Sequence, residues 1–339
     1  MTTAKSPFWQ KVVDDAKDEN GNQRPFFSMA PMEAVTDTIF RRVVAQAGGP
    51  DLYYTEFTNA ASMVHPEAKF SVQGRLAVAD GEKMPIAQIW GSKPEAIGGA
   101  AKLLPALGYQ AVDINMGCPD GTVIKNDSGS DLIRHPDRAA ALIAAAKESG
   151  LPVSVKTRLG FNQVDEYHDW LEMIFKQDVQ VLTIHLRTRK EMSKVEAHFE
   201  LIDDIVAMRD RISPQTLLQI NGDVKDYEHG LALAKEHPGV DGIMIGRGVL
   251  NDPYAFEPGN QDHTLAESIA LLKLQLDLFD EVNQTANKKN FEALKRYFKI
   301  YLRGFAHASQ LRQMLMETHA TDEVRALLKE HVGTLVAVD

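Results

Sequence analysis

The stretch from Gln110 to Thr157 reads QAVDINMGCPDGTVIKNDSGSDLIRHPDRAAALIAAAKESGLPVSVKT. It begins with an apolar run, passes through a loop rich in Gly, Asn, Asp and Ser, and continues in an Ala-rich segment between Pro136 and Gly150. A second apolar run follows. Proline in the first turn and glycine just past the end are typical helix boundaries, so the stretch predicts strand, helix and strand. Two strands joined through a helix form a parallel pair.

The same unit recurs along the whole first part of the chain. The apolar runs are Pro25–Ala30, Asp51–Thr55, Pro85–Trp90, Gln110–Asn115, Pro152–Thr157, Gln180–His185, Thr216–Asn221 and Asp241–Ile245. Several are rich in Val, Ile and Leu, as strands buried on both faces are. Eight such units favour an α/β fold of the closed (β/α)8 or TIM barrel type over an open doubly wound sheet. A Gly-x-Gly-x-x-Gly turn after the first strand, which an open dinucleotide-binding sheet would use, is absent.

The pattern changes after Asn260. The segments Leu265–Val282, Phe291–Ala308 and Asp322–Val332 have helical spacing, and no strand-like run returns. We therefore expect an N-terminal extension at residues 1–24, a catalytic barrel at 25–260 and a smaller C-terminal helical domain at 261–339.

Composition restricts the function. Apolar residues make up 44 % of the 339 residues, but no apolar run approaches the ~20 residues that cross a bilayer, and the N-terminus has no secretory leader. We expect a cytoplasmic protein without a membrane partner, and no protein partner is implied. One cysteine excludes an intramolecular disulfide and disfavours structural zinc, so no metal site is predicted. The net charge of −10 argues against broad nucleic-acid binding but allows a local basic patch.

Polar residues, together with Met32 and several glycines, stand at or just after the end of every predicted strand. They are Met32 and Glu33, Glu56, Gln88, Asn115 and Cys118, Lys156 and Arg158, His185 and Arg187, Asn221-Gly222-Asp223, and Gly246-Arg247-Gly248. In a barrel all these positions converge on one face, where catalytic groups lie. Each alone is an ordinary strand-terminal residue; together they predict a site.

Two parts of this ring suggest a flavin. Barrels often bind phosphate after strands 7 and 8, where glycines let backbone N–H groups approach an anion; Gly222, Gly246 and the cationic Arg247 fit that use. The alternative is that these glycines only make tight turns. Lys156 suits the electron-rich N1–C2=O edge of a reduced flavin, and Gln88 the other edge. A lysine inside a strand also needs a partner.

Cys118 is the only cysteine. A lone cysteine is commonly a small buried apolar side chain. Its place in a polar rim loop, which we expect to be mobile, favours a functional role instead. A thiol with the usual pKa of about 8.5 is mostly protonated at neutral pH, which suits a proton donor.

With these residues in view, the chain resembles the tRNA-dihydrouridine synthases. The resemblance runs from about Phe26 to Phe256 and carries, in order, APMEAVTD, AQIWGSKP, DINMGCP, SVKTRLGF, TIHLRTR, QINGDV and DGIMIGRGVLNDPYAF. DINMGCP combined with KTR and IHxRTR is highly specific. The segment YFKIYLRGFAHASQLRQML also resembles the family's RNA-binding helices.

The resemblance implies a cofactor, a substrate and a reaction. FMN would be bound by Pro31, Met32, Gln88, Lys156, His185, Asn221, Gly222, Asp223, Gly246 and Arg247. Cys118 would be the acid, and Asn115 and Arg158 would hold a flipped uracil. The reaction would reduce the C5–C6 double bond of a uridine in tRNA: NADPH or NADH reduces FMN, N5 delivers hydride to C6, and Cys118 protonates C5.

Three features depart from the family pattern. Leu186 stands where many members have glycine, Asn126 and Asp127 replace a lysine and a small residue, and about 20 residues precede the first strand. None removes a proposed catalytic group. All three bear on which uridine is chosen.

A basic stripe lies in the predicted helical domain. Arg296, Lys299 and Arg303 share one helical face, and Tyr297 and Tyr301 lie between them. Alone, such a stripe is commonly a solvated face; beside this barrel it predicts an RNA-binding surface, which Arg187 would continue toward the pocket.

Two other functions remain open. A small-molecule flavin oxidoreductase of the dihydroorotate-dehydrogenase type would explain the flavin residues but not the helical domain. A non-catalytic RNA-binding module would leave Lys156, Gln88 and Cys118 without a role.

Overall fold

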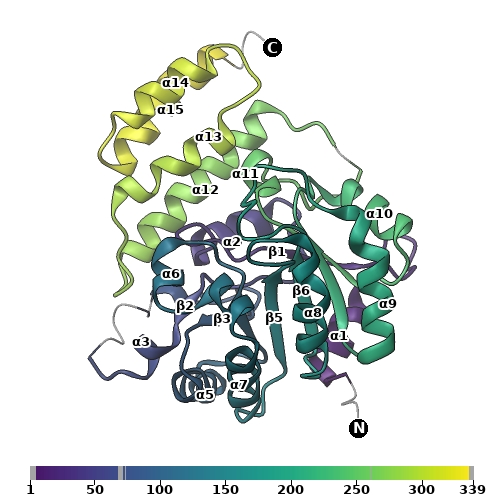
Figure 1. Ribbon diagram of the computed structural model, residues 1–339. Helices are drawn as coiled ribbons and strands as arrows, with labels where there is room; N and C mark the ends of the chain where they lie inside the picture. The colour runs from purple at the N-terminus through teal and green to yellow at the C-terminus, as the bar shows by residue number, and fades with distance from the viewer. Residues whose placement is uncertain (1–4, 68–71, 73, 260, 336–339) are drawn as a thin grey trace.

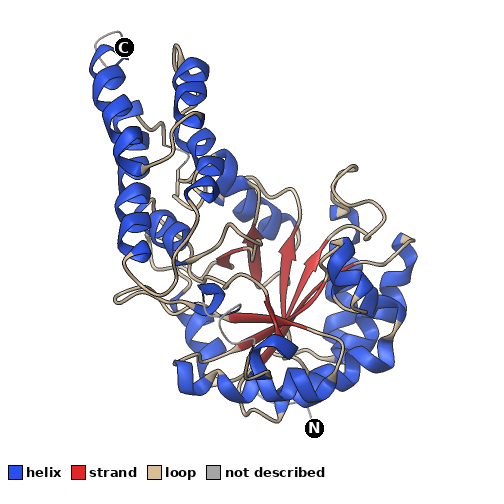
Figure 2. Ribbon diagram, turned by 90° about the vertical axis from the view of Figure 1, so that its left-hand side faces the viewer, coloured by secondary structure: helices blue, strands red, loops and turns tan. Residues whose placement is uncertain are grey.

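The computed structural model describes residues 5–67, 72, 74–259 and 261–335, so the outermost residues of the expected N-terminal extension and helical domain, 1–4 and 336–339, lie outside the described part. Eight parallel strands form one sheet in the order β1-β8-β7-β6-β5-β4-β3-β2. They are β1 Phe26–Met29, β2 Thr58–Asn59, β3 Ala87–Trp90, β4 Val112–Met116, β5 Val153–Arg158, β6 Val181–His185, β7 Leu217–Asn221 and β8 Gly242–Ile245. Figure 2 shows the strands enclosed by helices. The predicted α/β barrel is confirmed.

The barrel closes through the segment between β1 and β2. Phe26 to Met29 pair in register with Gly242 to Ile245 on one side of β1. On the other side, the backbone of Leu52 exchanges hydrogen bonds of 3.1 Å with Phe27 and Met29. The next residues then bond to Ile86, which precedes β3. The expected second strand, Asp51–Thr55, is therefore present only as two single bridges, and the regular strand β2 begins later, at Thr58.

Helices surround the sheet and connect its strands. The outer ring contains α2 Thr38–Gln46, α3 Ala60–Val64, α5 Pro94–Leu103, α7 Pro136–Lys147, α8 Tyr167–Phe175, α9 Ile202–Ile212 and α10 Tyr227–Glu236. Pro94 and Pro136 occupy the first turns of α5 and α7, as predicted. The rim segment after Cys118, predicted as an irregular loop, contains α6 Gly121–Lys125 and the 3-10 turn η3 Gly129–Arg134.

The N-terminal extension covers the lower end of the barrel. Helix α1, Pro7–Asp15, lies there (Figure 1) and buries Trp9 completely. The Trp9 ring lies 5.8 Å from the Phe26 ring, within an apolar cluster that includes first residues of several strands. The Ser6 backbone N–H donates to Gln180 Oε1 over 2.6 Å just before β6. The extension thus packs as part of the barrel core.

The barrel interior contains a polar layer that the apolar runs did not suggest. Its fully buried members are Ser28, Gln88, Asp113, Ser154, Thr183 and Gln219. They bond to one another: Ser154 Oγ donates to Asp113, Thr183 Oγ1 to Gln219, and Gln219 Nε2 to Ser28. Buried polar groups are tolerated when bonded in this way.

The C-terminal helices stand over the carboxyl ends of the strands (Figures 1 and 2). They are α12 Leu265–Asn283, α13 Phe298–Tyr301, α14 Ala308–Met316 and α15 Thr321–Leu335. The predictions of α12 and α15 are confirmed to within a few residues. Within the ranges described, no helix combines the length and apolar character needed to cross a bilayer.

The prediction of one helix over Phe291–Ala308 is wrong. That segment forms the 3-10 turns η6 Phe291–Ala293 and η7 Lys295–Tyr297, then the short α13. The chain turns at Gly304, whose φ of +80° lies in the left-handed region that glycine tolerates. Side chains from this segment bond to carbonyls of the barrel, so tertiary contacts override the helical periodicity.

Candidate active site

A cavity of about 820 Å³ opens at the carboxyl ends of the strands. Most of the predicted site residues line it: Pro31, Met32, Asn115, Cys118, Lys156, Arg158, His185, Asn221, Gly222, Asp223, Gly246 and Arg247. Gln88, Arg187 and the stripe residues Arg296, Lys299 and Arg303 are not among the lining residues. The barrel therefore brings together predicted site residues from six strand ends. The other five predicted residues lie outside this cavity.

Cys118 lies between two cavities. Besides the larger one, it lines a second cavity of about 650 Å³, together with Phe57 and Trp90. Its backbone N–H donates to Asn115 Oδ1 over 2.9 Å, and its carbonyl accepts from the Ser130 hydroxyl over 2.9 Å. Burial raises the pKa of the Cys118 thiol. The thiol is therefore protonated at physiological pH. Hydrogen bonds to the backbone N–H and carbonyl of Cys118 fix the residue that carries it.

Lys156 has the partner that its position requires. Its ammonium donates to Asn221 Oδ1 over 3.1 Å, and Asn221 Nδ2 donates to the Met244 carbonyl over 2.9 Å. The Asn221 oxygen is thus fixed toward Lys156. Burial, assisted by the charge of Arg158, lowers the pKa of Lys156 to about 8. Lys156 is a cation at neutral pH, though a more readily deprotonated one than a surface lysine.

Arg158 joins two loops at the edge of the cavity. Its Nε donates to the Gly117 carbonyl over 2.8 Å, and its Nη1 to the Thr188 and Met192 carbonyls over 3.2 and 3.1 Å. Burial lowers the pKa of Arg158 to about 10, still well above neutrality. Three backbone bonds fix the guanidinium plane and leave Nη2 outside them.

His185 is neutral and has one defined tautomer. Arg187 Nη1 lies 3.1 Å from His185 Nε2. A guanidinium only donates, so Nε2 accepts and the imidazole hydrogen is on Nδ1. Burial, reinforced by Arg158 and Lys156, holds the pKa of His185 well below its usual range. The residue thus offers the cavity a neutral ring without adding charge.

Arg187 and Asp223 organise this edge from behind. Arg187 is buried and pairs with the Asp223 carboxylate, which also accepts from Arg247 Nη2 over 3.0 Å. This burial does not fit the expectation that Arg187 continues a basic surface toward the pocket. The Arg187 guanidinium is paired with the Asp223 carboxylate, and its Nε donates to the Val195 carbonyl. Asp223 lines the cavity, and its carboxylate serves the two arginines.

Gln88 lies one residue layer below the cavity. It pairs in register with Asp113, two residues before Asn115, and is fully buried. Its amide is engaged at both ends, by Asp113 Oδ2 at 2.7 Å and by Asn115 Nδ2 at 3.0 Å. Sequence reasoning overlooked Asp113, although an acidic residue inside the apolar run AVDIN was the available signal.

Two glycines of the site stand where any side chain would clash with neighbouring protein atoms. A Cβ on Gly222, where φ is +114°, would come within 3.1 Å of the His185 ring. A Cβ on Gly248 would lie only 2.1 Å from the Lys225 carbonyl oxygen. The loops after β7 and β8 are therefore packed too closely against neighbouring protein atoms at these two positions to accept a larger residue. Within the described residues, no three His, Cys, Asp or Glu side chains gather to hold a metal ion.

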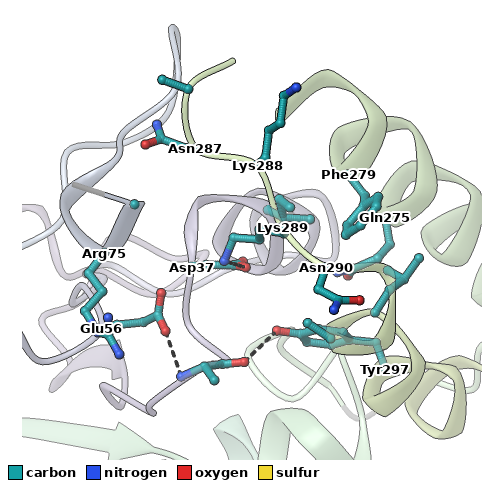
Figure 3. A pocket seen from close by; sticks show the side chains of 16 residues that line it. Asp37, Glu56, Arg75, Gln275, Phe279, Asn287, Lys288, Lys289, Asn290 and Tyr297 are labelled. Carbon is teal, nitrogen blue, oxygen red and sulfur yellow. Dashed lines mark hydrogen bonds and ion pairs between the residues drawn. The ribbon is translucent and has the colours of Figure 1, made fainter. Parts of the chain in front are cut away.

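A further cavity, of about 370 Å³, lies between the barrel and the helical domain (Figure 3). Ala34 is at its edge, in the loop after β1, with a φ of +56° that is unusual for alanine. The Ala34 N–H donates to the buried Glu56 over 2.7 Å, and its carbonyl accepts from Tyr297 and Arg296. Lys289 Nζ pairs with Asp37 over 2.5 Å across the same cavity. These contacts tie the helical domain to the loop that carries Met32.

The basic stripe is divided by these contacts. Arg296 donates to the Ala34 carbonyl over 2.9 Å and Arg303 to the Leu250 carbonyl over 2.7 Å, so both contact the barrel. Lys299 is exposed. Lys295, which the sequence places beside the stripe, is buried and pairs with Glu292.

The fold and this cavity define the class: a barrel enzyme whose site combines fixed cations, a neutral imidazole and a neutral thiol. Residues 28–337 match the family model described as Dihydrouridine synthase (Dus). A protein named probable tRNA-dihydrouridine synthase 2, from Bacillus subtilis (strain 168), is 54 % identical over 307 residues, which cover 91 % of this chain and 94 % of that protein. The chain belongs to the dihydrouridine synthase family and is an oxidoreductase.

Further comparisons agree with this family and with the fold. A probable tRNA-dihydrouridine synthase of Staphylococcus aureus (strain MRSA252) is 52 % identical over 91 % of this chain and 93 % of its own. Among solved structures, a complex of 2-naphthoyl-CoA reductase superposes with a TM-score of 0.52 at 11 % identity, over 72 % of this chain and 51 % of that one. That similarity concerns the fold alone.

Proposed function

We propose that this protein reduces the C5–C6 double bond of a uridine in tRNA to dihydrouridine, in the cytoplasm, with FMN as cofactor and NADPH or NADH as reductant. The observation that carries the proposal is the placement of Cys118. The neutral thiol of the only cysteine in the chain lines the same cavity as Lys156, Arg158 and His185. Family membership supplies the reaction, and the cavity supplies the acid.

The residues fit an anionic, ring-shaped cofactor. The glycine-containing loops at Gly222 and Gly246, with the cation of Arg247, line the cavity and suit the phosphate of FMN. Lys156, fixed by Asn221, suits the electron-rich edge of the flavin ring. Pro31, Met32 and His185 complete the walls. Gln88, Asp223 and Arg187 would act through the residues they hold, because the protein itself engages their polar groups.

The chemistry that FMN would supply here, when bound and reduced by NADPH or NADH, is hydride transfer to C6 of the uracil. The chain supplies the proton. Hydride addition leaves enolate-like charge at C5, which the Cys118 Sγ–H neutralises by donating its proton. The resulting thiolate is stabilised by the nearby charges of Arg158 and Lys156, both of which favour the ionised thiol. The S–H bond of Cys118 breaks and a C–H bond forms at C5, so the negative charge at C5 is neutralised and the negative charge appears on the Cys118 sulfur.

Two residues are placed to position the uracil. Arg158 lines the cavity with its guanidinium plane fixed, so its Nη2 is available to a uracil oxygen at little entropic cost. Asn115 lines the cavity beside Cys118, and its amide oxygen holds the Cys118 backbone. The base must leave its stack to reach this site, the usual arrangement for enzymes that modify bases.

The helical domain provides the surface for the rest of the tRNA. We assign Lys299 as a phosphate contact, because it is exposed on α13, in the domain that stands over the carboxyl ends of the strands (Figure 1). Arg296 and Arg303 contribute charge beside it while also fastening the domain to the barrel.

The test of this function is direct. The purified protein is incubated with NADPH and unmodified tRNA, and dihydrouridine is quantified by mass spectrometry, with free orotate and uracil as competing substrates. We expect a yellow protein and turnover of tRNA alone. Turnover of free orotate or uracil, or a protein without the flavin absorbance band, would overturn the proposal.

The acid is tested in the same assay. Cys118→Ala should retain flavin and its reduction by NADPH, while tRNA turnover falls by about a hundredfold or more, the usual contribution of a general acid. Full activity of Cys118→Ala would remove the thiol from the mechanism.

A further inference from the structure

A chain of hydrogen bonds runs from the barrel core to the backbone of Cys118. Asp113 is fully buried, and its carboxylate accepts from Ser154 Oγ over 2.6 Å and from Gln88 Nε2 over 2.7 Å. Gln88 Oε1 accepts from Asn115 Nδ2 over 3.0 Å. Asn115 Oδ1 accepts from the backbone N–H groups of Gly117 and Cys118 over 3.1 and 2.9 Å.

Each bond in this chain fixes the direction of the next one. An ionised carboxylate only accepts hydrogen bonds, so Gln88 must turn its NH2 group toward Asp113. The Gln88 oxygen then faces Asn115, which must offer its own NH2 group. The Asn115 oxygen is thereby turned toward the two backbone N–H groups, its only arrangement that satisfies them.

The reverse arrangement is excluded by the same inventory of donors and acceptors. If Gln88 were turned over, its oxygen would face the Asp113 carboxylate and its NH2 group would face the Asn115 NH2 group. If both amides were turned over, the Asn115 NH2 group would oppose two backbone N–H groups. In a buried site an unmade or repulsive contact of this kind is costly.

The Asp113 carboxyl group is ionised at neutral pH. Burial raises the pKa of Asp113 to about 6, and the hydrogen bonds from Ser154 and Gln88 oppose the rise. At neutral pH the carboxylate thus remains the fixed acceptor at the start of the chain.

We propose that Asp113 is a positioning residue whose carboxylate sets the direction of the Gln88 and Asn115 amides and so holds the Cys118 thiol in its place at the cavity. Asp113 does not line that cavity. Its influence on proton transfer rests on the function proposed for Cys118, whereas its influence on the Cys118 backbone does not.

Asp113→Asn tests the direction of the chain. An asparagine keeps the size of the side chain but carries one donor and one acceptor, so Gln88 no longer faces a group that can only accept, and residue 113 no longer fixes the direction of the Gln88 and Asn115 amides. We expect the backbone around Cys118 to loosen and alkylation of the thiol by N-ethylmaleimide to accelerate about fivefold or more. Cys118 is the only cysteine, so intact mass reads its modification directly.

Ser154→Ala is the matched control. It removes the other hydrogen bond to Asp113, which also opposes the rise of the Asp113 pKa, so both variants are alkylated at mildly alkaline pH, where the carboxylate facing Gln88 still only accepts. We expect its alkylation rate to stay near that of the unaltered enzyme, even where stability falls. Equal acceleration in Ser154→Ala and Asp113→Asn would reduce Asp113 to a structural role and overturn the proposal.

The double variant Asp113→Asn with Gln88→Glu restores the order of donors and acceptors. The new amide donates to the new carboxylate, which accepts again from Asn115. We expect its alkylation rate to return toward the original value. A double variant that folds but alkylates as fast as Asp113→Asn, or that fails to fold, would contradict the proposal.

Turnover is measured on the same purified holoenzymes. Asp113→Asn should lower kcat for tRNA by about ten- to a hundredfold with a smaller effect on KM, because a displaced acid affects the chemical step. Should the unaltered enzyme make no dihydrouridine, the proposed function fails while the alkylation series still decides the role of Asp113. Should turnover be present and the alkylation rates be equal, only the positioning role fails.

Discussion

At the scale of single residues, burial acts on two side chains of the site in opposite directions. It disfavours charge, so it lowers the pKa of Lys156 and raises that of the Cys118 thiol. At neutral pH the lysine remains a cation and the thiol keeps its proton. Those are the states that an anion-stabilising group and a proton donor need.

The pKa of Lys156 predicts a pH dependence for flavin binding. Lys156 is charged below about pH 8 and neutral above it. If its charge holds the flavin, FMN affinity of the cofactor-free protein falls above pH 8, by at most about tenfold per pH unit. Quenching of flavin fluorescence, titrated between pH 6 and 10, measures this.

Lys156→Met separates this effect from other titrations. The variant should bind FMN more weakly at pH 7 and show no fall in affinity near pH 8. Persistence of the same fall in Lys156→Met would assign the pH dependence to another group. His185 is not that group, because its pKa lies well below its usual range.

At the scale of elements, the N-terminal helix α1 shows how a segment outside the barrel becomes part of its core. Trp9 is fully buried against the lower ends of the strands, opposite the cavity. Its indole Nε1 has no hydrogen-bond partner among the residues described. The contribution of this side chain is therefore apolar packing.

Trp9→Ala should destabilise the protein by about 3–5 kcal/mol, the usual cost of removing a buried aromatic side chain. Trp9→Phe should cost much less, because it keeps most of the packing and removes an N–H group that is not hydrogen bonded. Urea denaturation measures both variants, with Gln10→Ala, at an exposed position of the same helix, as control. Equal losses for Trp9→Ala and Gln10→Ala would place α1 outside the folding unit.

The loop after β1 is the element that joins the two parts of the chain. Ala34 is held in a left-handed conformation, with its N–H bonded to Glu56 and its carbonyl bonded to Arg296. The φ of a non-glycine residue in this region is maintained only by surrounding contacts. The helical domain thus supports the conformation of the loop that carries Met32 into the cavity.

At the scale of the whole molecule, the helical domain stands over the carboxyl ends of the strands, where the cavity opens (Figures 1 and 2). The chain carries a net charge of −10, so attraction to a polyanion depends on where its cations lie. Lys299 is exposed on the domain over the carboxyl ends of the strands (Figure 1). The sequence placed this residue in a stripe with Arg296 and Arg303, which the structure also uses to fasten the domains.

Lys299→Glu should raise the KM for tRNA without lowering kcat. If Lys299 neutralises one phosphate, its loss reduces the slope of log affinity against log salt concentration by about 1. Steady-state kinetics at about 50 to 300 mM KCl give this slope, because the affinity of phosphate contacts falls with salt over this range.

Lys235→Glu is the control for net charge. Lys235 is exposed near the end of α10, and helices of a barrel run opposite to its strands, so it lies at the far end from the cavity. Its reversal makes the same change in net charge and should leave KM unaltered. Identical effects of Lys299→Glu and Lys235→Glu would attribute both to overall charge.

Much of this architecture was predictable because it rests on local patterns. Apolar runs such as Pro152–Thr157 are short and regular, and all but Asp51–Thr55 lie within a residue or two of an observed strand. The strand prediction was least accurate at Asp51–Thr55, which makes only one isolated bridge to β1 and one to the segment before β3. The segment Phe291–Ala308 was also predicted wrongly, since its turns are set by contacts with the barrel more than 200 residues away in sequence.

The sequence by itself determined the barrel, the set of polar residues at its upper face and the family, because periodicity and motif order are properties of the chain alone. Only the tertiary structure decided the role of each side chain. It paired Lys156 with Asn221, directed Arg187 onto Asp223, and placed Gln88 beneath the cavity in contact with Asp113. Such roles depend on burial and on donors from distant strands, and neither is a property of the local sequence.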